Sequence, residues 1–485
     1  MYGLERSKLH NKCVAIFVAS KLKGMLISMG LELKNKYSAN VIFIAKDVNV
    51  KNVILRHIPD HKNIKVLSEI ECMNFNDKDI LIQALEIEKK YGVNLAFLMS
   101  LDRALGQGYL FNAEKVPDIK RSSLNHLDKL RYLICQFRRI EESLDNVDIL
   151  ISEFTDGYRS VISKNNNILS LSLVLARYGN RYLWSDNDYQ TSTPYIERVK
   201  YYLSSNISID QSESNINYVP HNMGEGRLSV RNFNYFRSIK QSIGIIYNDT
   251  KIWIRGNYAK DSYHLYGWVP SRFRAIHNYN YVNKIGVDLN NIKKYKVIYF
   301  TLHIEPEVSL LYFSPEFSNT IEAVTWLSKS IPSDVMIVLK EHPFSYGVRS
   351  IEYYKKINKI GNICWSKPEI DSKTWIEKSN AIATITGTVG TEGVYYEKPV
   401  ISFGKHQVIN MLPSVFYVKN YEDTKNAVKK IFDNTIKDDT LSLSKSICHN
   451  ALFDSSFEMS NYQNIHASEE LQPEFSLIAI KNLLD

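Results

Sequence analysis

The 485-residue sequence has few cysteines and no long apolar run. Its five cysteines are widely spaced, with no CxxC pair and no His-Cys spacing of the kind found at metal sites. We therefore expect a reducing, cytoplasmic compartment. The apolar run that begins at Cys13 is only about seven residues long, far below the ~20 residues that a membrane span requires. Neither membrane insertion nor export is expected.

The motifs of several enzyme classes are also missing. The sequence contains no Walker A, GxGxxG, HExxH or GxSxG stretch, so none of the site types that these motifs build is predicted. The stretch SDND at 185–188 matches the DxD pattern of metal-bound nucleotide sugars only superficially, because Asp and Asn are common in loops. No metal site is predicted. The chain has no internal repeat and no low-complexity tract.

The composition is that of a globular protein, with 44% hydrophobic and 23% charged residues. A chain of this length favours two domains over one. The net charge of +8 is concentrated between residues 195 and 296, which hold fifteen Lys/Arg and seven Asp/Glu. The same stretch is rich in Tyr, Trp and Phe, and such a surface suits an anionic bilayer face, an acidic glycan or a nucleic acid. The alternative is a packed, Tyr-rich subdomain with solvated charges.

Apolar runs of strand length alternate with helical stretches in both halves of the chain, but this alternation is lost over 186–294. In the first half, the strands are expected at 13–20, 40–46, 64–70, 94–103 and 147–154, and the helices at 22–37, 77–91 and 122–146. In the second half, the strands are expected at 296–303, 334–343, 362–366, 381–386 and 399–404, and the helices at 316–330, 350–358, 371–379, from about 391, and at 422–436.

This spacing predicts an α/β fold with a doubly wound parallel sheet in each half. The expected units are an N-terminal Rossmann-like domain over 1–185, a bridging or inserted basic aromatic region over 186–294, a C-terminal Rossmann-like domain over 295–460, and a C-terminal helix over 461–485 that crosses back to the first half. Ligands of such folds bind at the carboxyl ends of the strands. We therefore expect a binding cleft between the two domains.

The stretch TITGTVGTEGVYYEKPVISFG at 384–404 combines small residues with one acid between two apolar runs. Gly387, Gly390 and Gly393 permit tight turns and close approach of the backbone, and free N–H groups at a helix start attract phosphate oxygens. Glu392, expected in the first helical turn, suits sugar hydroxyls better than a phosphate. The alternative is a plain strand-to-helix turn.

Two further stretches end strands with polar residues. LKEHPFSYGVR places Lys340, Glu341 and His342 on an exit loop before Pro343, with Arg349 downstream. Lys340 and His342 are candidates to neutralise a phosphate leaving group, and histidine is suited to donating a proton near neutral pH.

FTLHIEPEVSLL at 300–311 carries His303, Glu305 and Glu307. Strand alternation predicts that these three side chains share one face, as in a convergent polar site. The alternative is a polar edge of the sheet.

Acidic residues follow two strands of the first half: Asp102 after one, Glu153 and Asp156 after the other. Glycosyl transfer needs a carboxylate near the acceptor hydroxyl, as a general base or, if configuration is retained, as a nucleophile. All three are candidate catalytic residues, and solvated loop acids are the alternative.

The stretches TLHIEPEVSLLYFSPEF, IPSDVMIVLKEHPFSYGVRS and TGTVGTEGVYYEKPVISFG, in this order, resemble the bacterial capsule polysaccharide biosynthesis proteins, a group that includes Kdo transferases acting on CMP-Kdo. The resemblance is specific over roughly 296–405 and looser in the first half. It implies the GT-B architecture of two Rossmann-like domains. The residues that it implies around the nucleotide and its phosphate are Lys340, His342, Thr386, Gly387, Thr388 and Glu392.

The pair His342-Pro343 is also similar to that of bacterial sialyl- and polysialyltransferases, in which an acidic motif ending in Gly lies in the first domain. Here that motif would be Asp156-Gly157. The sequence departs from the pattern because Thr155, not an acid, precedes Asp156. This departure shifts the expected base toward Glu153 or Asp102.

The expected function is a cytoplasmic glycosyltransferase of surface-polysaccharide assembly that transfers a Kdo-type or nonulosonic acid sugar from a CMP donor to a glycan or glycolipid acceptor. No cofactor is expected beyond this donor, because CMP is already a good leaving group. The inner membrane surface and polysaccharide-assembly proteins are expected partners, and nucleic acid is not. The alternatives are a UDP- or GDP-sugar transferase, a nucleotide-sugar 2-epimerase of the same fold, and a non-catalytic scaffold.

Overall fold

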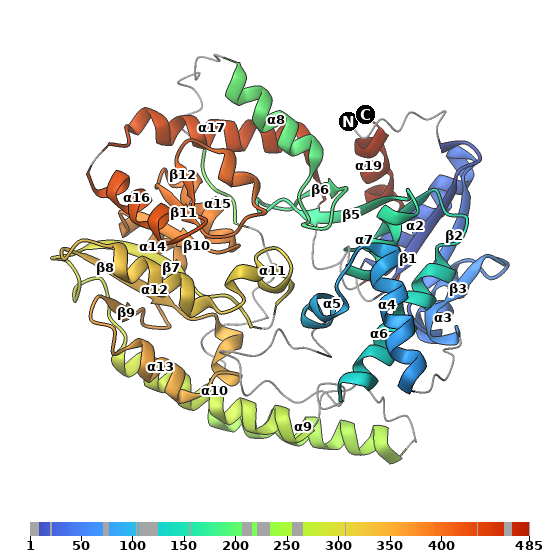
Figure 1. Ribbon diagram of the computed structural model, residues 1–485, viewed down its shortest axis with the longest axis horizontal. Coiled ribbons are helices and arrows are strands. Elements are labelled where there is room, and N and C mark those ends of the chain that lie inside the picture. The colour runs from blue at the N-terminus through green and yellow to red at the C-terminus, as the bar shows by residue number, and fades with distance from the viewer. Residues whose placement is uncertain are drawn as a thin grey trace.

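The computed structural model describes residues 9–19, 22–70, 77–102, 105, 125–154, 157–205, 216–220, 233–254, 265–305, 307–433, 435–459 and 468–484. Within these ranges the chain forms two α/β domains, each built around its own sheet (Figure 1). Each sheet is covered by helices on both faces. The predicted class, an α/β fold with two Rossmann-like domains, is confirmed.

The N-terminal sheet has the order β13-β6-β5-β4-β1-β2-β3. Strands β1 to β5 are parallel, whereas β6 and β13 are antiparallel to their neighbours. Its strands are β1 (Cys13–Val18), β2 (Asn40–Ala45), β3 (Ile64–Val66), β4 (Ile149–Ser152), β5 (Leu169–Leu175), β6 (Arg181–Ser185) and β13 (Phe457–Glu458). Its helices are α2 (Lys23–Tyr37), α3 (Val48–His57), α4 (Asp77–Tyr91), α5 (Leu95–Leu101), α6 (His126–Ser143), α7 (Gly157–Asn165) and α19 (Pro473–Leu484).

The C-terminal sheet is parallel throughout and has the order β12-β11-β10-β7-β8-β9. Its strands are β7 (Lys296–Thr301), β8 (Val335–Lys340), β9 (Ile363–Trp365), β10 (Ala381–Thr384), β11 (Val400–Ser402) and β12 (Val415–Tyr417). Its helices are α11 (Val308–Leu311), α12 (Thr320–Ser330), α13 (Ile351–Ile357), α14 (Ser372–Lys378), α15 (Thr388–Tyr395), α16 (Tyr421–Phe432) and α17 (Asp438–Ser455). All five strands predicted in this half are present.

The chain exchanges elements between the domains at two places. Helix α8 (Thr193–Ser204) follows the N-terminal sheet in sequence but packs on α17, whereas α19 returns to the first domain and packs on α2 (Figure 1). Trp184 Nε1 donates to the carbonyl of Ala479 (2.9 Å), and Ser476 Oγ donates to that of Met25 (2.9 Å). The end of the chain therefore completes the core of the first domain.

Two long helices lie in the stretch predicted as a bridge. Helices α9 (Tyr235–Ile254) and α10 (Leu265–Ile285) pack on each other, and α9 runs along the lower edge of the molecule in Figure 1. Among the described residues, no helix has both the length and the apolar character needed to cross a membrane.

One strand expected in the first domain is wrong. Residues 94–103 were expected to form a strand, but 95–101 form α5, because the Asn94 side chain accepts hydrogen bonds from the N–H groups of Ala96 and Phe97 and so caps a helix. Of the described cysteines, Cys13, Cys364 and Cys448 are free and Cys135 is disulfide-bonded.

Candidate active site

Strands β7 and β10 lie side by side in the C-terminal sheet, and the chain leaves them in opposite directions. It proceeds from β7 to β8 on one side and from β10 to β11 on the other. At such a topological switch point the following loops diverge and leave a crevice at the carboxyl ends of the strands, where α/β folds bind their ligands. The polar stretch that begins at residue 300 follows β7, and the glycine-rich stretch follows β10. The candidate residues that the sequence predicted after β7 and after β10 therefore lie close together.

His303 connects the two strands across the switch point. Its Nε2 atom accepts a hydrogen bond from the backbone N–H of Thr386 (3.1 Å). Burial, with the nearby charge of Arg177, lowers the pKa of His303 to about 3, so the ring is neutral near pH 7. Because Nε2 is the acceptor, the ring proton lies on Nδ1, which has no hydrogen-bond partner among the described residues. A buried donor without an acceptor marks a position where a ligand oxygen can bind.

Gly387 precedes α15, and no side chain caps the first turn of this helix. A Cβ atom at position 387 would lie 2.9 Å from Thr384 Oγ1 and 3.5 Å from His303 Nε2. Any larger residue would therefore push against the polar atoms of the switch point. The uncapped N–H groups of a helix start attract anions, and the absence of a Cβ lets an anion approach them closely.

Helix α15 begins at Thr388, three residues earlier than the sequence predicted. Gly390 therefore lies inside the helix, where a Cβ atom would be 2.8 Å from Ile409 Cδ1, so this glycine serves close packing and not ligand approach. Glu392 is not in the first turn, as was expected, but beyond it. Burial raises the pKa of Glu392, and the Thr388 side chain hydrogen-bonds to it.

Three of the predicted ligand-binding residues form a buried charge cluster instead. Arg349 Nη1 lies 3.2 Å from Glu305 Oε2, and Arg349 Nε lies 2.8 Å from Glu341 Oε2. Burial alone would lower the pKa of Arg349, but the two carboxylates outweigh it and raise this pKa well above its usual value. Arg349 Nη2 also donates to the carbonyl of His303 (3.1 Å). The cluster thus fixes the loops after β7 and β8 to each other.

The expectation that His303, Glu305 and Glu307 share one strand face is wrong, because β7 ends at Thr301. All three residues lie on the loop that follows. Glu305 points into the charge cluster and also accepts a hydrogen bond from Thr320 Oγ1 (2.6 Å). Glu307 accepts one from Ser309 Oγ (2.8 Å). Only His303 of the three carries an unpartnered polar atom.

His342 begins the loop after β8. Its Nδ1 atom accepts a hydrogen bond from the N–H of Phe344 (3.3 Å), so the neutral ring carries its proton on Nε2. Burial, followed by the charge of Arg349, lowers the pKa of His342 to about 4. The loop is held from behind by α10, where Asn278 Nδ2 donates to the carbonyls of Tyr346 (2.7 Å) and Arg349 (2.9 Å). His342 is therefore a positioned, neutral hydrogen-bond donor.

Lys340 is the last residue of β8 and turns toward the loop before α14. Its ammonium group donates to the carbonyl oxygens of Pro368 (3.3 Å) and Ile370. Burial lowers the pKa of Lys340 to about 8. In this structure its charge is directed at main-chain carbonyls and not at the switch point.

The candidate acids of the first domain lie near the carboxyl ends of its strands. Glu153 directly follows β4, which neighbours β1 at the switch point of this sheet, and it is 7% exposed. Asp102 follows α5, where Tyr158 Oη donates to Asp102 Oδ2 (3.2 Å). Asp156 lies outside the described residues.

Sequence reasoning missed Arg177. This residue lies in the turn between β5 and β6, has the left-handed φ angle of 59°, and directs Nη1 at the carbonyl of Gly387 (3.4 Å). Burial lowers its pKa, and no ion pair of the described residues includes it. Glu307 and Glu392 influence it only from a distance. The sequence feature that could have pointed to Arg177 is its place in LARYGNR, where an arginine precedes an aromatic residue and a glycine at the tip of a hairpin.

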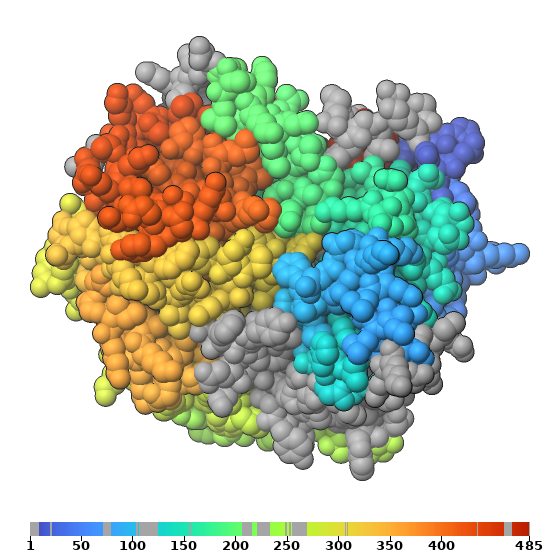
Figure 2. Space-filling view, in the orientation of Figure 1, coloured from blue at the N-terminus to red at the C-terminus, as the bar shows by residue number. Residues whose placement is uncertain are grey.

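The domains also meet through a column of aromatic rings. Phe97 of α5 stacks on Tyr312 (6.4 Å between centroids), Tyr312 on Tyr189 (5.7 Å), and Tyr189 on His406 (3.4 Å). Figure 2 shows the blue atoms of the first domain against the yellow atoms of the second in the same part of the molecule. Asp188, in the weak DxD match, accepts hydrogen bonds from Ser160 and Lys164 and so has a structural role.

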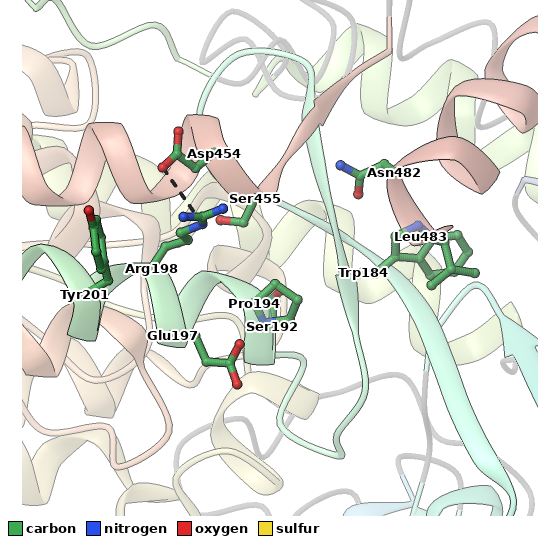
Figure 3. A pocket seen from close by; sticks show the side chains of 10 residues that line it. All are labelled: Trp184, Ser192, Pro194, Glu197, Arg198, Tyr201, Asp454, Ser455, Asn482 and Leu483. Atoms are coloured by element: carbon green, nitrogen blue, oxygen red, sulfur yellow. Dashed lines mark ion pairs between the residues drawn. The ribbon is translucent and has the colours of Figure 1, made fainter. Parts of the chain in front are cut away.

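A pocket of about 420 Å³ lies elsewhere, where α8, α17 and α19 approach one another (Figure 3). Arg198 and Asp454 face each other across part of it, 3.9 Å apart. None of the residues predicted to bind the donor lines this pocket. It occupies the region where the chain passes between the domains, so it belongs to the domain connection.

Residues 257–408 match the family described as capsule polysaccharide biosynthesis protein. The resemblance drawn from the sequence is thus confirmed, and the matched range contains β7, β8, β10 and α15. Every switch-point residue of the C-terminal domain lies inside it. No curated protein matches the chain by sequence.

Solved structures with similar folds share little sequence with this chain. A beta Kdo 2,7 transferase, KpsC of Thermosulfurimonas dismutans, is 12% identical with a TM-score of 0.32, covering 71% of this chain and 89% of its own. The UDP-GlcNAc 2-epimerase of Neisseria meningitidis bound to UDP-GlcNAc is 12% identical with a TM-score of 0.27, covering 98% and 99%. MnaA of S. aureus with UDP is 10% identical with a TM-score of 0.28, covering 91% and 92%. TM-scores this low support no conclusion about the function of this chain.

Proposed function

We propose that this protein is a glycosyltransferase of capsule or lipopolysaccharide assembly that transfers a Kdo-type or nonulosonic acid from a CMP donor to a glycan or glycolipid acceptor. The family match supports the pathway, and the two switch points support a nucleotide-sugar fold. The reaction needs no metal or further cofactor, because CMP is itself a good leaving group. The proposed location is the cytoplasm or the inner membrane surface, near the polysaccharide-assembly proteins.

The observation that carries this proposal is the group of proton donors at the β7–β10 switch point. Among the described residues, His303 offers an Nδ1–H without an acceptor, His342 offers Nε2–H, and Arg177 brings from the first domain a cation without an ion-pair partner. A CMP-linked ulosonic acid carries two negative charges, on its phosphate and on its carboxylate. Charge-assisted hydrogen bonds to these groups are about twice as strong as neutral ones. The site is therefore suited to an anionic sugar donor.

In the proposed reaction, the bond between the anomeric carbon and the phosphate oxygen breaks, and the phosphate keeps the electron pair. His342 Nε2–H stabilises the charge that develops on the departing phosphate. The acceptor hydroxyl forms the new bond to the anomeric carbon and gives its proton to a carboxylate of the first domain. Glu153 is the favoured base because it lies at the switch point of its sheet, and Asp102 is the alternative.

Thermal unfolding with added CMP, UDP and GDP tests the donor assignment. CMP is expected to raise the Tm, because a ligand that binds only the folded state stabilises that state by mass action. UDP and GDP at the same concentration are expected to leave the Tm unchanged. Stabilisation by UDP without CMP would contradict the CMP donor and favour a UDP-sugar transferase or an epimerase.

A transfer assay with the Glu153→Gln variant tests catalysis separately from binding. The variant is expected to retain the CMP-induced rise in Tm and to lose transfer by about 10²-fold or more, since general-base catalysis contributes about that much. Asp102→Asn serves as the comparison that assigns the base. If both variants fold and cells that carry them still assemble the glycan at wild-type levels, a scaffold role replaces the proposed chemistry.

A further inference from the structure

Helix α9 exposes an apolar face. Phe236 is 84% exposed, Ile243 61%, Tyr247 65% and Ile254 72%. At about 100° per residue, the exposed apolar residues, with Tyr235 at the edge, fall within an arc of about 120° on one side of the helix. The residues of this face, here called the outer face, are Phe236, Ile239, Ile243, Ile246, Tyr247 and Ile254.

The protein-facing side of α9 is polar, the reverse of an ordinary surface helix. Ser238 and Ser242 are each 5% exposed, and Gln241 accepts a hydrogen bond from Arg272 of α10. A helix that packs on a protein core normally turns its apolar stripe inward and its polar residues to water. Here Ser238 and Ser242 face the protein, while Ile239, Ile243, Ile246 and Ile254 face outward. The outer face therefore requires a partner that is not supplied by the described part of this chain.

Basic residues flank the outer face. At 100° per residue, Arg237, Lys240 and Lys251 fall in a band directly beside the apolar arc, and these three side chains are exposed. Between residues 235 and 254 the only acid in the sequence is Asp249. An apolar stripe bordered by Lys and Arg is complementary to a surface that is negative at its boundary and apolar beneath.

The position of α9 leaves this face accessible. The helix has 20 residues, about 30 Å at 1.5 Å per residue, and runs along the outer edge of the molecule, away from both sheets (Figure 1). The apolar residues follow its length from Phe236 to Ile254. A flat surface can therefore contact the whole stripe at once.

We propose that α9 docks in the plane of a bilayer that contains anionic lipid, with its outer face inserted at the boundary between headgroups and acyl chains. The basic flank distinguishes this partner from an apolar protein groove, which would not require it. An interfacial helix of this kind lies on a membrane without spanning it. The docking does not depend on which nucleotide sugar the protein uses, and it would hold the protein beside a lipid-linked acceptor.

Vesicle flotation with the full-length protein tests this proposal. Vesicles of phosphatidylcholine alone are compared with vesicles in which about a third of the lipid is phosphatidylglycerol, at low and high salt. The protein is expected to float with the anionic vesicles at least tenfold more than with the neutral ones, and less at high salt, because screening weakens the contacts of Lys and Arg with anionic headgroups.

The double variant Phe236→Ser/Ile243→Ser is expected to lose at least tenfold of this binding. Both side chains are exposed, so the folded protein should keep its Tm. Tyr201→Ser is the matched control, because Tyr201 is 54% exposed on α8, at the opposite side of the molecule in Figure 1, and this variant should still float. A charge variant, Arg237→Glu/Lys240→Glu, should lose binding to anionic vesicles while leaving the apolar stripe intact.

Three results would overturn the proposal. One is the absence of flotation with either vesicle type. Another is flotation that the α9 variants leave unchanged, which would place the membrane contact elsewhere. The third is a wild-type protein that does not bind vesicles and is a dimer by light scattering, while the Phe236→Ser/Ile243→Ser variant is a monomer. The partner of the outer face would then be a second copy of the chain.

Discussion

Arg177 combines two unfavourable features at the residue scale. Its backbone is in the left-handed region, which costs a non-glycine residue about 1–3 kcal/mol, and its buried guanidinium lacks an ion-pair partner among the described residues. Strain and unpaired charge of this kind persist at positions that serve a ligand. Arg177 therefore supports the proposed anion site more directly than any motif in the sequence does.

Replacing Arg177 with Ala is expected to lower CMP affinity at least tenfold, because a hydrogen bond to a charged group contributes about 1.5–3 kcal/mol. The ligand-free variant should be as stable as the wild type or more stable, since an unpaired buried cation is removed. Calorimetric titration with CMP and urea unfolding measure the two effects. The matched control is Arg198→Ala, at the domain connection, which should leave affinity unchanged. A variant that loses stability but not affinity would assign Arg177 a structural role.

His303 and His342 predict the pH dependence of stability. Burial lowers their pKa values to about 3 and about 4, whereas an unfolded histidine titrates near 6.5. Between these values the unfolded chain binds protons that the folded protein excludes. Stability is therefore complete above about pH 6.5 and falls as the pH drops toward 4, by up to ~1.4 kcal/mol per pH unit for each histidine.

Urea unfolding at pH 7, 6 and 5 measures this slope. His303→Gln should make the slope shallower, even though loss of the Thr386 hydrogen bond lowers stability at every pH. The exposed His126 on α6 provides the control, because His126→Gln should leave the slope as it is. Equal slopes for wild type and His303→Gln would contradict the burial of a neutral His303.

At the scale of elements, α15 shows how packing against a sheet overrides helix propensity. Gly390 and Gly393 lie inside this eight-residue helix, where alanine would be the better helix former. A Cβ atom at Gly393 would lie 2.9 Å from Ile382 Cγ1 and 3.1 Å from Val400 Cγ2. The glycines bring α15 close to β10 and β11, and this closeness sets where the helix start lies relative to His303.

Gly393→Ala is expected to destabilise the protein by about 1–3 kcal/mol, the usual cost of overpacking a close-packed interior. Gly244 in α9 is the matched control because nothing lies within 4 Å of a Cβ there, so Gly244→Ala should stabilise by up to ~1 kcal/mol. Urea unfolding compares the two. Changes of the same sign in both variants would show that packing does not determine the choice of glycine in α15.

At the scale of the whole molecule, the last helix stabilises the first domain. Ala479, Ile480 and Leu483 belong to the same apolar core as β1 and α2, more than 400 residues away in the sequence. The strand β13 extends the same sheet. The first domain therefore lacks part of its sheet and core until β13 and α19 have been added.

Ile480→Ala is expected to destabilise the first domain by about 2–5 kcal/mol, the range for removing most of a buried aliphatic side chain. Lys481→Ala, on the exposed side of the same helix, should change stability by less than about 0.5 kcal/mol. Hydrogen exchange resolves the effect by domain. Faster exchange in α2 and β1 is expected, and an effect confined to the C-terminal sheet would contradict this account.

The sequence by itself determined the α/β class, five of the six strands of the C-terminal sheet and the chain stretches that meet at its switch point, but it missed β12. Buried parallel strands are continuous apolar runs separated by amphipathic helices, and that pattern is local. The same reasoning failed at 94–103, because a short apolar run suits strand and helix equally and the cap at Asn94 decided for the helix.

The tertiary structure alone decided which polar residues pair with one another in the interior and which are left for the proposed site. Glu305, Glu341 and Arg349 looked like site residues, but they form ion pairs with one another in the interior. Arg177 carried no motif, yet its hairpin places it against the helix start after β10. The outward face of α9 was likewise decided by its packing on α10. A side chain's partner depends on contacts between distant parts of the chain, and local sequence patterns do not encode those contacts.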